Sequence, residues 1–351
     1  MGARTHPVRS GALESAGPHV VLQVGEVAGV AAGLTAALTR HSSWEPRHVE
    51  LSQPSGRSAL ARIIDLSRRA MSTRRAIRTT IMENNPAVVH LHWARYAPFV
   101  STPGVPLIVH AHGSDVRDRG GFGGTVVRRA LERAQAVVVS TPDLLAHTPR
   151  NAVYLPSPVD TDLFVPSPSS TDQADSLIRP PTVLLFAQLT AIKGAEQLVA
   201  AAAALRSERP SVRIIGIAGG THDAQATAAG VELLTHLGRV ELSRLLRSVD
   251  VVVGQQRLGA LGLSELEAMA CGRAVVAPIR QDLYDDPVPV IDAPDPDAIA
   301  RRCIELIGDP VARAATGDRA RDYVVRNHAP HVVAGLLTSL YERVCGASAA
   351  G

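Results

Sequence analysis

Short apolar runs alternate with longer amphipathic segments through the first half of the chain. Runs of four to six mostly apolar residues predict strands at 19–24, 47–51, 87–92, 106–110, 136–140 and 152–155. The segments between them repeat their apolar residues at helical spacing, which predicts helices at 28–40, 58–83 and 123–134. Alternation of strands and helices is typical of a parallel α/β sheet covered by helices.

A second series of the same kind follows a stretch rich in Pro, Ser and Asp. Its predicted strands lie at 182–187, 212–218, 231–235, 250–253 and 274–277, and its helices at 192–207, 241–248, 263–271, 296–307, 311–326 and 331–344. We therefore predict two Rossmann-like, doubly wound parallel-sheet domains that face a cleft. The predicted boundaries are a flexible tail (1–18), a first domain (19–160), a linker (161–181), a second domain (182–328) and a helix crossing back to the first domain (329–351).

The composition is that of an ordinary globular protein, with 46% hydrophobic and 20% charged residues in 351. No run approaches the roughly 18 apolar residues that a membrane span needs. The first 18 residues have no apolar core and do not resemble a secretory signal. The three cysteines (Cys271, Cys303 and Cys345) are widely spaced, which favours a reducing compartment, and we expect a cytoplasmic location.

The segment 249–278 carries the clearest chemical signal in the chain. It predicts a buried strand, a loop containing Gly254, Gly259 and Gly262, a short helix and a second strand. The glycines are expected to keep side chains out of the loop so that a ligand can approach the backbone. Ser264, followed three residues later by Glu267, predicts a capped helix start. The free N–H groups at such a helix end favour an anion, above all a phosphate.

The letters LSELEAMACGRAVVAP in this segment resemble the signature of the family-4 retaining glycosyltransferases. The resemblance implies the GT-B fold, a nucleoside-diphosphate sugar as co-substrate, and no metal ion or other cofactor. It implies that Gly262, Leu263 and Ser264 bind the donor diphosphate and that Glu267 holds the ribose. Two features in or directly after this segment depart from the family pattern, and Gln188 is a third departure outside it.

The first departure lies in the glycine loop, where Gly259 stands in place of the family's first glutamate. The contact of that glutamate with the donor sugar is therefore missing, and nearby Glu265 is expected to point elsewhere. The second departure follows residue 278, where the family's Gly-Gly loop is absent.

The letters LTAIKG after the strand at 182–187 resemble the family's Arg-and-Lys segment, in which both cations neutralise the donor diphosphate. Lys193 matches the family lysine and is the only lysine in the chain, whereas Gln188 replaces the arginine. Preorganised cations at a departing diphosphate stabilise the charge that develops in the transition state. The loop containing His236, Gly238 and Val240 corresponds to one that often lines the base, with uridine as the default.

Two His-x-His pairs end predicted strands of the first domain. Residues two apart on a strand share a face, so His90 with His92, and His110 with His112, can each aim two imidazoles together. The letters HAHGSD resemble the family segment whose histidine contacts the donor sugar, which points to His112 with Asp115 close by. A metal site is the competing interpretation, because His-x-His pairs also bind metals.

Two further features give weaker signals. Gly25 and Gly29 fit the family's glycine-rich loop near the diphosphate and acceptor, a pattern with many false positives. The helical region 58–83 is basic, and three interpretations stay open for it. It is a solvated helix face, a docking site for an anionic membrane, or a surface that attracts an anionic acceptor. Its cations are Arg62, Arg68, Arg69, Arg74, Arg75 and Arg78. With 3% aromatic residues and no nucleic-acid motif, we expect no nucleic-acid partner.

The resemblance implies a retaining, metal-independent glycosyltransferase acting on an acceptor hydroxyl. Both a cell-envelope glycan or lipid and a specialised metabolite such as an antibiotic remain open as acceptors. The Gln188 and Gly259 departures also support a non-catalytic GT-B companion protein that binds nucleotide or partners. A nucleotide-sugar epimerase of the same fold is the third hypothesis. It would form product without an acceptor.

Overall fold

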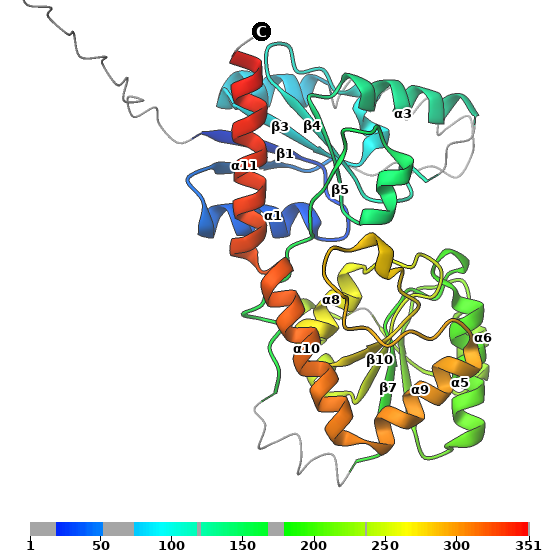
Figure 1. The fold of residues 1–351 in the computed structure, drawn as a ribbon. Helices are drawn as coiled ribbons and strands as arrows, with labels where there is room; N and C mark the ends of the chain where they lie inside the picture. Colours follow the sequence, from blue (N-terminus) through cyan, green and yellow to red (C-terminus); the bar gives the residue numbers. More distant parts are fainter. Residues whose placement is uncertain (1–18, 52–73, 118–120, 168–178, 236, 350–351) are drawn as a thin grey trace, which may run out of the picture.

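The computed structural model describes residues 19–51, 74–117, 121–167, 179–235 and 237–349, which form two α/β units stacked one above the other (Figure 1). The first sheet is entirely parallel, with strand order β2-β1-β3-β4-β5-β6. Its strands are β1 (Val20–Val24), β2 (Glu45–Val49), β3 (Val88–His92), β4 (Leu107–Ala111), β5 (Ala136–Val139) and β6 (Val153–Tyr154). The helices beside it are α1 (Val30–His41), a helix over 74–84, α3 (Gly121–Arg133) and the short turns η1 (Ala94–Phe99) and η2 (Pro142–His147).

The second sheet is also parallel, with strand order β11-β10-β7-β8-β9. Its strands are β7 (Thr182–Leu185), β8 (Arg213–Ile217), β9 (Glu232–Leu234), β10 (Val251–Val253) and β11 (Ala274–Val276). Its helices are η3 (Ala191–Lys193), α5 (Ala195–Glu208), α6 (Asp223–Ala228), α7 (Arg239–Ser248), α8 (Leu263–Ala270), η4 (Gln281–Leu283), α9 (Pro296–Gly308) and α10 (Pro310–His328). The predicted fold class, two doubly wound parallel sheets, is confirmed.

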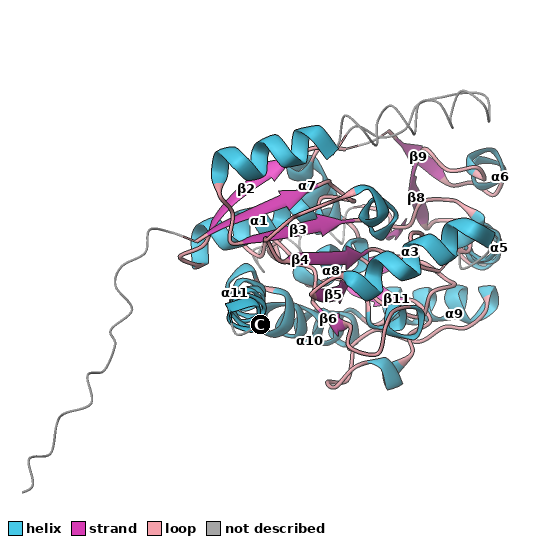
Figure 2. Ribbon diagram, turned by 90° about the horizontal axis from the view of Figure 1, so that it is seen from above, coloured by secondary structure: helices cyan, strands magenta, loops and turns pink. Residues whose placement is uncertain are grey.

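The last helix, α11 (Pro330–Ala349), leaves the second unit and lies against α1 of the first (Figures 1 and 2). Its apolar face is Val333, Leu337 and Tyr341, all with no exposed surface, and these residues share a core with Leu34 and Leu38 of α1. Burial of such side chains is worth roughly 1.5–3 kcal/mol each. The C-terminal helix is therefore an integral layer of the first domain.

Each sheet has one point where the strand order reverses, and ligands of doubly wound proteins bind beyond the strand ends at such points. In the first sheet the reversal lies between β1 and β3, so it faces the loops that begin at Gly25 and Trp93. In the second it lies between β7 and β10 and faces the loop carrying Lys193 and the loop before α8. The topology thus selects four loops as candidates for a binding site.

Several predicted elements have different bounds in the structure, among them the helix at 192–207, helix α7 and strand β2. The helix predicted at 192–207 is two elements, because Gly194 adopts a left-handed φ of 79° between η3 and α5. Helix α7 begins at Arg239, two residues before the predicted start. Strand β2 likewise begins two residues early, because its residues pair with β1 in the register that starts at Val20 and Glu45.

The structure describes residues 161–167 and 179–181 of the predicted linker. Phe164 is fully buried in a core of the second domain, whereas residues 168–178 lie outside the described residues. The predicted N-terminal tail also lies outside them. Within the described part of the chain, no helix combines the length and the apolar character needed to cross a bilayer.

Candidate functional site between the two sheets

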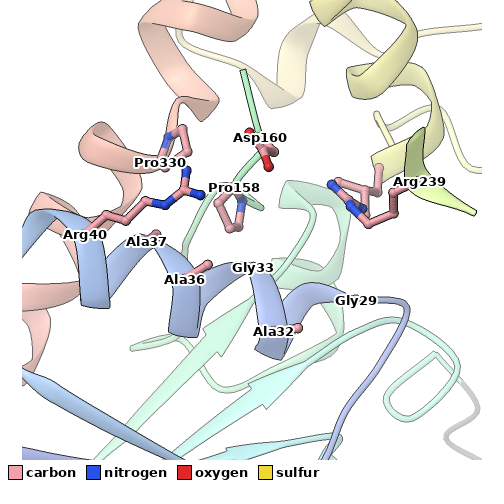
Figure 3. Close-up of a pocket in the computed structure, with 11 residues that line it drawn as sticks. Gly29, Ala32, Gly33, Ala36, Ala37, Arg40, Pro158, Asp160, Arg239 and Pro330 are labelled. Carbon is pink, nitrogen blue, oxygen red and sulfur yellow. The ribbon is translucent and has the colours of Figure 1, made fainter. Parts of the chain in front are cut away.

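Two adjoining pockets lie where the sheets face each other. The α7–α8 pocket is lined by Ala28 of the first domain together with Phe186, Ile217, Leu237, Gly238, Arg239, Leu242, Leu263, Ser264 and Glu267. The α1 pocket is lined by Gly29, Ala32, Gly33, Ala36, Ala37, Arg40, Pro158, Asp160, Arg239, Leu263 and Pro330. Figure 3 shows the small residues of α1 along one wall, with Arg40 and Arg239 reaching in from opposite sides. Arg239 and Leu263 line both pockets, so the two spaces meet at the start of α7 and α8.

Helix α8 begins at Leu263, and the capping residues differ from the prediction. Gly262, in extended backbone, precedes the first helical residue, and the Glu265 carboxylate reaches back to accept from the Gly262 N–H at 3.0 Å. The predicted cap of Ser264 with Glu267 is therefore wrong, because Ser264 already lies inside the first turn. In the described structure no acceptor lies on the N–H groups of Leu263 and Ser264, which stay available to an anion.

The glycines of the loop before α8 make room for the protein's own side chains. A Cβ at Gly254 would lie 2.6 Å from Oε1 of Glu265, and one at Gly262 would lie 2.9 Å from Oε2. A Cβ at Gly259 would lie 3.0 Å from Cγ of Arg280. At these three positions the space that a side chain would fill adjoins the protein's own side chains, and the approach of a ligand to the loop backbone stays a prediction. Glu265 is turned to the loop backbone, where it also accepts from the Gln255 N–H at 2.7 Å.

Glu267 is a buried carboxylate on the wall of the α7–α8 pocket. Its Oε1 accepts from Nη1 of Arg239 at 3.1 Å, and the Arg239 guanidinium lies 5.1 Å from the centre of the Phe164 ring. Burial raises the pKa of Glu267 to about 7, although the charge and hydrogen bond of Arg239 act in the opposite direction. A carboxylate with one partner here keeps acceptor capacity for a ligand hydroxyl.

The loop with Lys193 lies directly against the loop before α8. The Gln256 N–H donates to the Lys193 carbonyl at 2.9 Å, and a Cβ at Gly194 would lie 2.6 Å from Cβ of Gln256. Gln188, at the start of the same loop, is exposed and donates from Nε2 to the Gly219 carbonyl at 3.3 Å. The reversal point therefore brings Lys193, Gln188 and the α8 loop to one edge of the sheet.

The predicted glycine loop of the first domain is built differently from the α8 loop. Gly25 and Gly29 both adopt left-handed φ angles, of 85° and 81°. The N-terminal N–H groups of α1 at Ala31 and Ala32 donate to the Glu26 carboxylate at 3.3 and 2.9 Å. Glu26 thus occupies backbone N–H groups of α1 that a phosphate would use. In α8, by contrast, the first two backbone N–H groups have no acceptor in the described structure.

Asp115 organises the loop after β4. Its carboxylate accepts from the N–H groups of Gly113 at 2.7 Å, His112 at 3.0 Å and Ala94 at 2.8 Å. Burial raises the pKa of Asp115, while these backbone N–H groups lower it. The side chain is buried and its oxygens face the backbone, so the geometry gives Asp115 a positioning role beside His112.

The four histidines of the two His-x-His pairs form one cluster across β3 and β4. His90 stacks on His92 with ring centres 4.7 Å apart, and His110 stacks on His112 at 4.3 Å. Nδ1 of His92 lies 3.1 Å from Nε2 of His112, which forms a hydrogen bond between the pairs. Burial lowers the pKa of both His90 and His112 to about 3. It also lowers the pKa values of His92 and His110 well below the ordinary value for histidine. All four rings are therefore neutral at pH 7.

A metal ion is the alternative occupant of this cluster. Among the described residues, His90, His92 and His110 offer ligand nitrogens within 4.8 Å of one another. Their rings are inclined by only 14° to 36°. Imidazole lone pairs lie in the ring plane, so near-parallel rings direct them side by side and away from a common point. The geometry favours a packed hydrogen-bonded cluster.

The remaining predicted residues fall into two groups. Gly238 precedes α7, and Val240 lies in its first turn with 48% of its surface exposed, so Val240 is not in a loop. His236, Arg62, Arg68 and Arg69 lie outside the described residues, whereas Arg74, Arg75 and Arg78 project from the helix over 74–84 and are exposed.

Sequence reasoning missed three features of the site. Arg239 joins both pockets, and only its place one residue after Gly238 could have drawn attention to it. Trp93 adopts a left-handed φ of 78° directly after β3, which costs of order 1–3 kcal/mol in a non-glycine residue. Arg117 pairs with Asp143 at 2.6 Å beside Gly113. Trp93 and Arg117 carry no comparable signal in the neighbouring sequence.

Comparison with known proteins finds a family match for the part of this site that the second domain contributes. Residues 180–309, which hold Lys193, Arg239 and Glu267, match the model of the family described as glycosyl transferases group 1. The second domain is a glycosyl transferases group 1 domain. Over 178 residues the chain is 34% identical to a D-inositol 3-phosphate glycosyltransferase of Arthrobacter sp. (strain FB24), covering 43% of this chain and 42% of that protein. A GDP-mannose-dependent monoacylated alpha-(1-6)-phosphatidylinositol monomannoside mannosyltransferase of Corynebacterium glutamicum is 24% identical over 54% of this chain and 55% of its own length.

Solved structures extend the likeness to both domains. Sucrose-phosphate synthase from Thermosynechococcus elongatus superimposes with a TM-score of 0.73 at 16% identity, covering 94% of this chain and 100% of that one. HepE of Anabaena, solved with UDP-glucose, gives 0.68 at 16% identity over 92% and 99%. The chain has the GT-B fold, as predicted. It spans about half the length of the curated relatives it matches.

Proposed function

We propose that this protein is a retaining glycosyltransferase that moves a sugar from a nucleoside-diphosphate sugar to an acceptor hydroxyl. The observation that carries the proposal is the α7–α8 pocket, where the buried Glu267 carboxylate lies on α8 and the N–H groups of Leu263 and Ser264 stay open at its N-terminus. A hydroxyl-binding carboxylate beside an anion-binding helix end suits a ribose diphosphate.

In this proposal the departing diphosphate is stabilised by α8 and by Lys193, whose loop packs on the α8 loop. Negative charge grows on the leaving phosphate as the sugar bond breaks, and fixed donors in a partly enclosed cleft stabilise it without reorganisation. Glu267 holds the ribose and His112 contacts the sugar. The proposal includes no metal ion. UDP is its default nucleotide, which is supported by the UDP-glucose bound in the HepE structure.

The first test is a calorimetric panel of UDP, GDP, dTDP and ADP and their sugars on the wild type and Lys193→Ala. Ligand at about a hundred times its dissociation constant should stabilise the protein by roughly 2.7 kcal/mol. We expect one nucleotide class to bind the wild type and to lose at least tenfold in affinity in Lys193→Ala. Arg209→Ala, which removes an exposed cation at the far end of α5, is the matched control and should bind normally.

The donor that binds then enters an acceptor screen covering phosphorylated polyols, glycolipids and specialised metabolites. The anomeric configuration of the product, measured by NMR, reports retention. Product formation without any acceptor would instead identify an epimerase.

A non-catalytic companion protein is the second candidate, and two observations favour it. The exposed Gln188 replaces a cation, and Gly259 leaves Arg280 where a sugar-binding glutamate would stand. On this hypothesis nucleotide binds but no donor is consumed with any acceptor. Turnover that Lys193→Ala abolishes would exclude it.

We also propose that the exposed arginines of the helix over 74–84 contribute to contact with an anionic membrane surface. Arg75 and Arg78 are exposed beside the buried Ile77, so the helix is anchored by its apolar side and presents cations to solvent. Each cation near such a surface is worth about 1 kcal/mol. Co-sedimentation with phosphatidylserine vesicles should weaken in Arg75→Gln/Arg78→Gln, and neutral vesicles should bind neither protein.

A further inference from the structure

A continuous hydrogen-bonded chain connects the C-terminal helix to His112. Tyr341 of α11 accepts from Nε2 of Gln23 at 3.0 Å, and Oε1 of Gln23 lies 2.8 Å from Nε2 of His92. Nδ1 of His92 then lies 3.1 Å from Nε2 of His112. Tyr341, Gln23 and His92 have no exposed surface, so water does not compete for these bonds. The partners come from α11, β1, β3 and the end of β4.

The direction of this chain determines which nitrogen of each imidazole carries the proton. Gln23 donates its amide N–H to Tyr341, so its oxygen accepts and His92 must be protonated on Nε2. Nδ1 of His92 is then an acceptor, and His112 must donate to it from a protonated Nε2. The Nδ1 of His112 is left with a free lone pair. A neutral His112 agrees with its burial, which lowers its pKa to about 3.

The orientation of the Gln23 amide sets this direction, and the Tyr341 hydroxyl is compatible with it because it has two partners. The hydroxyl accepts from Gln23, which leaves its own O–H to donate to Nδ1 of His90, 2.7 Å away. If the Gln23 amide were turned over, the hydroxyl would have to donate to Gln23, and the tautomers of His92 and His112 would both reverse. The ring of Tyr341 packs on Trp44 with ring centres 4.9 Å apart. This contact holds the Tyr341 hydroxyl at the end of the hydrogen-bonded chain.

We propose that Tyr341 and Gln23 are positioning residues that hold His112 as the Nε2–H tautomer, so that its Nδ1 accepts a hydrogen bond from a hydroxyl of the bound sugar. This inference rests on the proposed function for the sugar contact, whereas the tautomer itself is independent of it. The outer partners of a functional histidine commonly fix its tautomer and ring orientation in this way. Here the outermost partner, Tyr341, belongs to the C-terminal helix and lies 318 residues from Gln23 in sequence.

The test reads the tautomers directly with ¹⁵N-histidine labelling and long-range ¹H–¹⁵N NMR of the full chain, with His92 and His112 assigned through His92→Asn and His112→Asn. In the wild type we expect a single Nε2–H tautomer for both histidines. Tyr341→Phe keeps the ring but removes the hydroxyl, so Gln23 loses its direction and both tautomers of His112 become populated. Tyr323→Phe removes a buried hydroxyl from α10 and should leave the spectrum unchanged.

Kinetics with the donor and acceptor identified above provide the second readout. We expect Tyr341→Phe to lower kcat by roughly 2- to 10-fold with less than twofold change in the KM for donor, because only a fraction of the molecules present the accepting nitrogen. Gln23→Leu, which cuts the chain at its centre, should lower kcat at least as much. It also serves as the test if Tyr341→Phe does not fold.

The outcomes separate the two proposals. An Nδ1–H tautomer of His112 in the wild type, or an unchanged spectrum in both Tyr341→Phe and Gln23→Leu, overturns the positioning role. The expected tautomers in a protein that consumes no donor support the hydrogen-bonded chain and reject the glycosyltransferase. A loss of kcat in Tyr341→Phe with unchanged tautomers rejects the mechanism proposed here.

Discussion

Arg239 and Glu267 lie 3.1 Å apart where the two interdomain pockets meet, and this pair links the two walls of the α7–α8 pocket. The guanidinium is half-exposed and the carboxylate is buried, so the pair is asymmetric. A ribose that binds Glu267 must share the carboxylate with Arg239 or displace it.

Removing the cation should raise the pKa of Glu267 further. The charge and hydrogen bond of Arg239 lower this pKa, so Arg239→Met is expected to move it above about 7, as measured by ¹³C NMR of the labelled glutamates. Arg257→Met removes a guanidinium from the same domain that pairs with Glu196, and it should leave the Glu267 titration in place. An unchanged Glu267 titration in Arg239→Met would show that the pair does not form in solution.

Glu267 should also make stability depend on pH. Its pKa is about 7 in the folded protein and 4.5 as a model group, so the folded state binds the extra proton between these values. The contribution of Glu267 to the free energy of unfolding is therefore greatest below pH 4.5. This contribution, on the order of 3 kcal/mol, is lost as the pH rises to 7. Urea unfolding of Glu267→Gln against the wild type isolates this contribution, because the variant should lack it.

The histidine cluster should act with the opposite sign. Burial lowers the pKa values of its members, so the unfolded chain takes up protons below pH 6.5 that the folded protein refuses. Stability from these groups is present above pH 6.5 and is lost as the pH falls towards 3. His110 has no partner on either nitrogen in the described structure. His110→Phe should therefore reduce the loss between pH 7 and 5 and be neutral or stabilising by up to about 2 kcal/mol.

The matched variant for His110 is His110→Asn. It removes the titration but keeps a buried polar group, so it should flatten the pH dependence without stabilising the protein. Equal stability of the two variants at pH 7 would show that the His110 nitrogens are hydrated.

Gly259 should resist substitution for two separable reasons. Its φ of 64° disfavours any side chain, and a Cβ would lie 3.0 Å from Cγ of Arg280. We expect Gly259→Ala to cost roughly 1–2 kcal/mol in urea unfolding. In an Arg280→Ala background the steric part should disappear and the backbone part remain, so the two changes should not be additive. Full additivity would place Arg280 away from this loop in solution.

Glu265 should be essential to the loop before α8. Its two oxygens accept from Gln255 at 2.7 Å and Gly262 at 3.0 Å, and an amide can satisfy only one of these N–H groups. Glu265→Gln is expected to cost roughly 1–3 kcal/mol and to weaken nucleotide binding, because it loosens the helix end. Glu196→Gln on α5, an exposed acid, serves as the control. A fully stable Glu265→Gln would indicate that water replaces these bonds.

The sequence by itself determined the two α/β domains and the family of the second. Strands such as Val251–Val253 and helices such as Leu263–Ala270 depend on local apolar spacing and on nearby glycines, which are readable in the chain. The same local signals located Lys193 and the α8 helix end at strand termini. They did not resolve whether α8 is capped by Ser264 with Glu267 or by Gly262 with Glu265, because in both pairs a glutamate follows the cap residue by three positions.

Only the tertiary structure decided which side chains meet. The space at Gly259 belongs to Arg280, the partner of Glu267 is Arg239, and the chain that orients His112 starts at Tyr341. These partners are brought together by strand order and by the path of the last helix, and no local pattern encodes either. Burial, which shifts the pKa values of Glu267 and His112, likewise exists only once both sheets and their covering helices have packed.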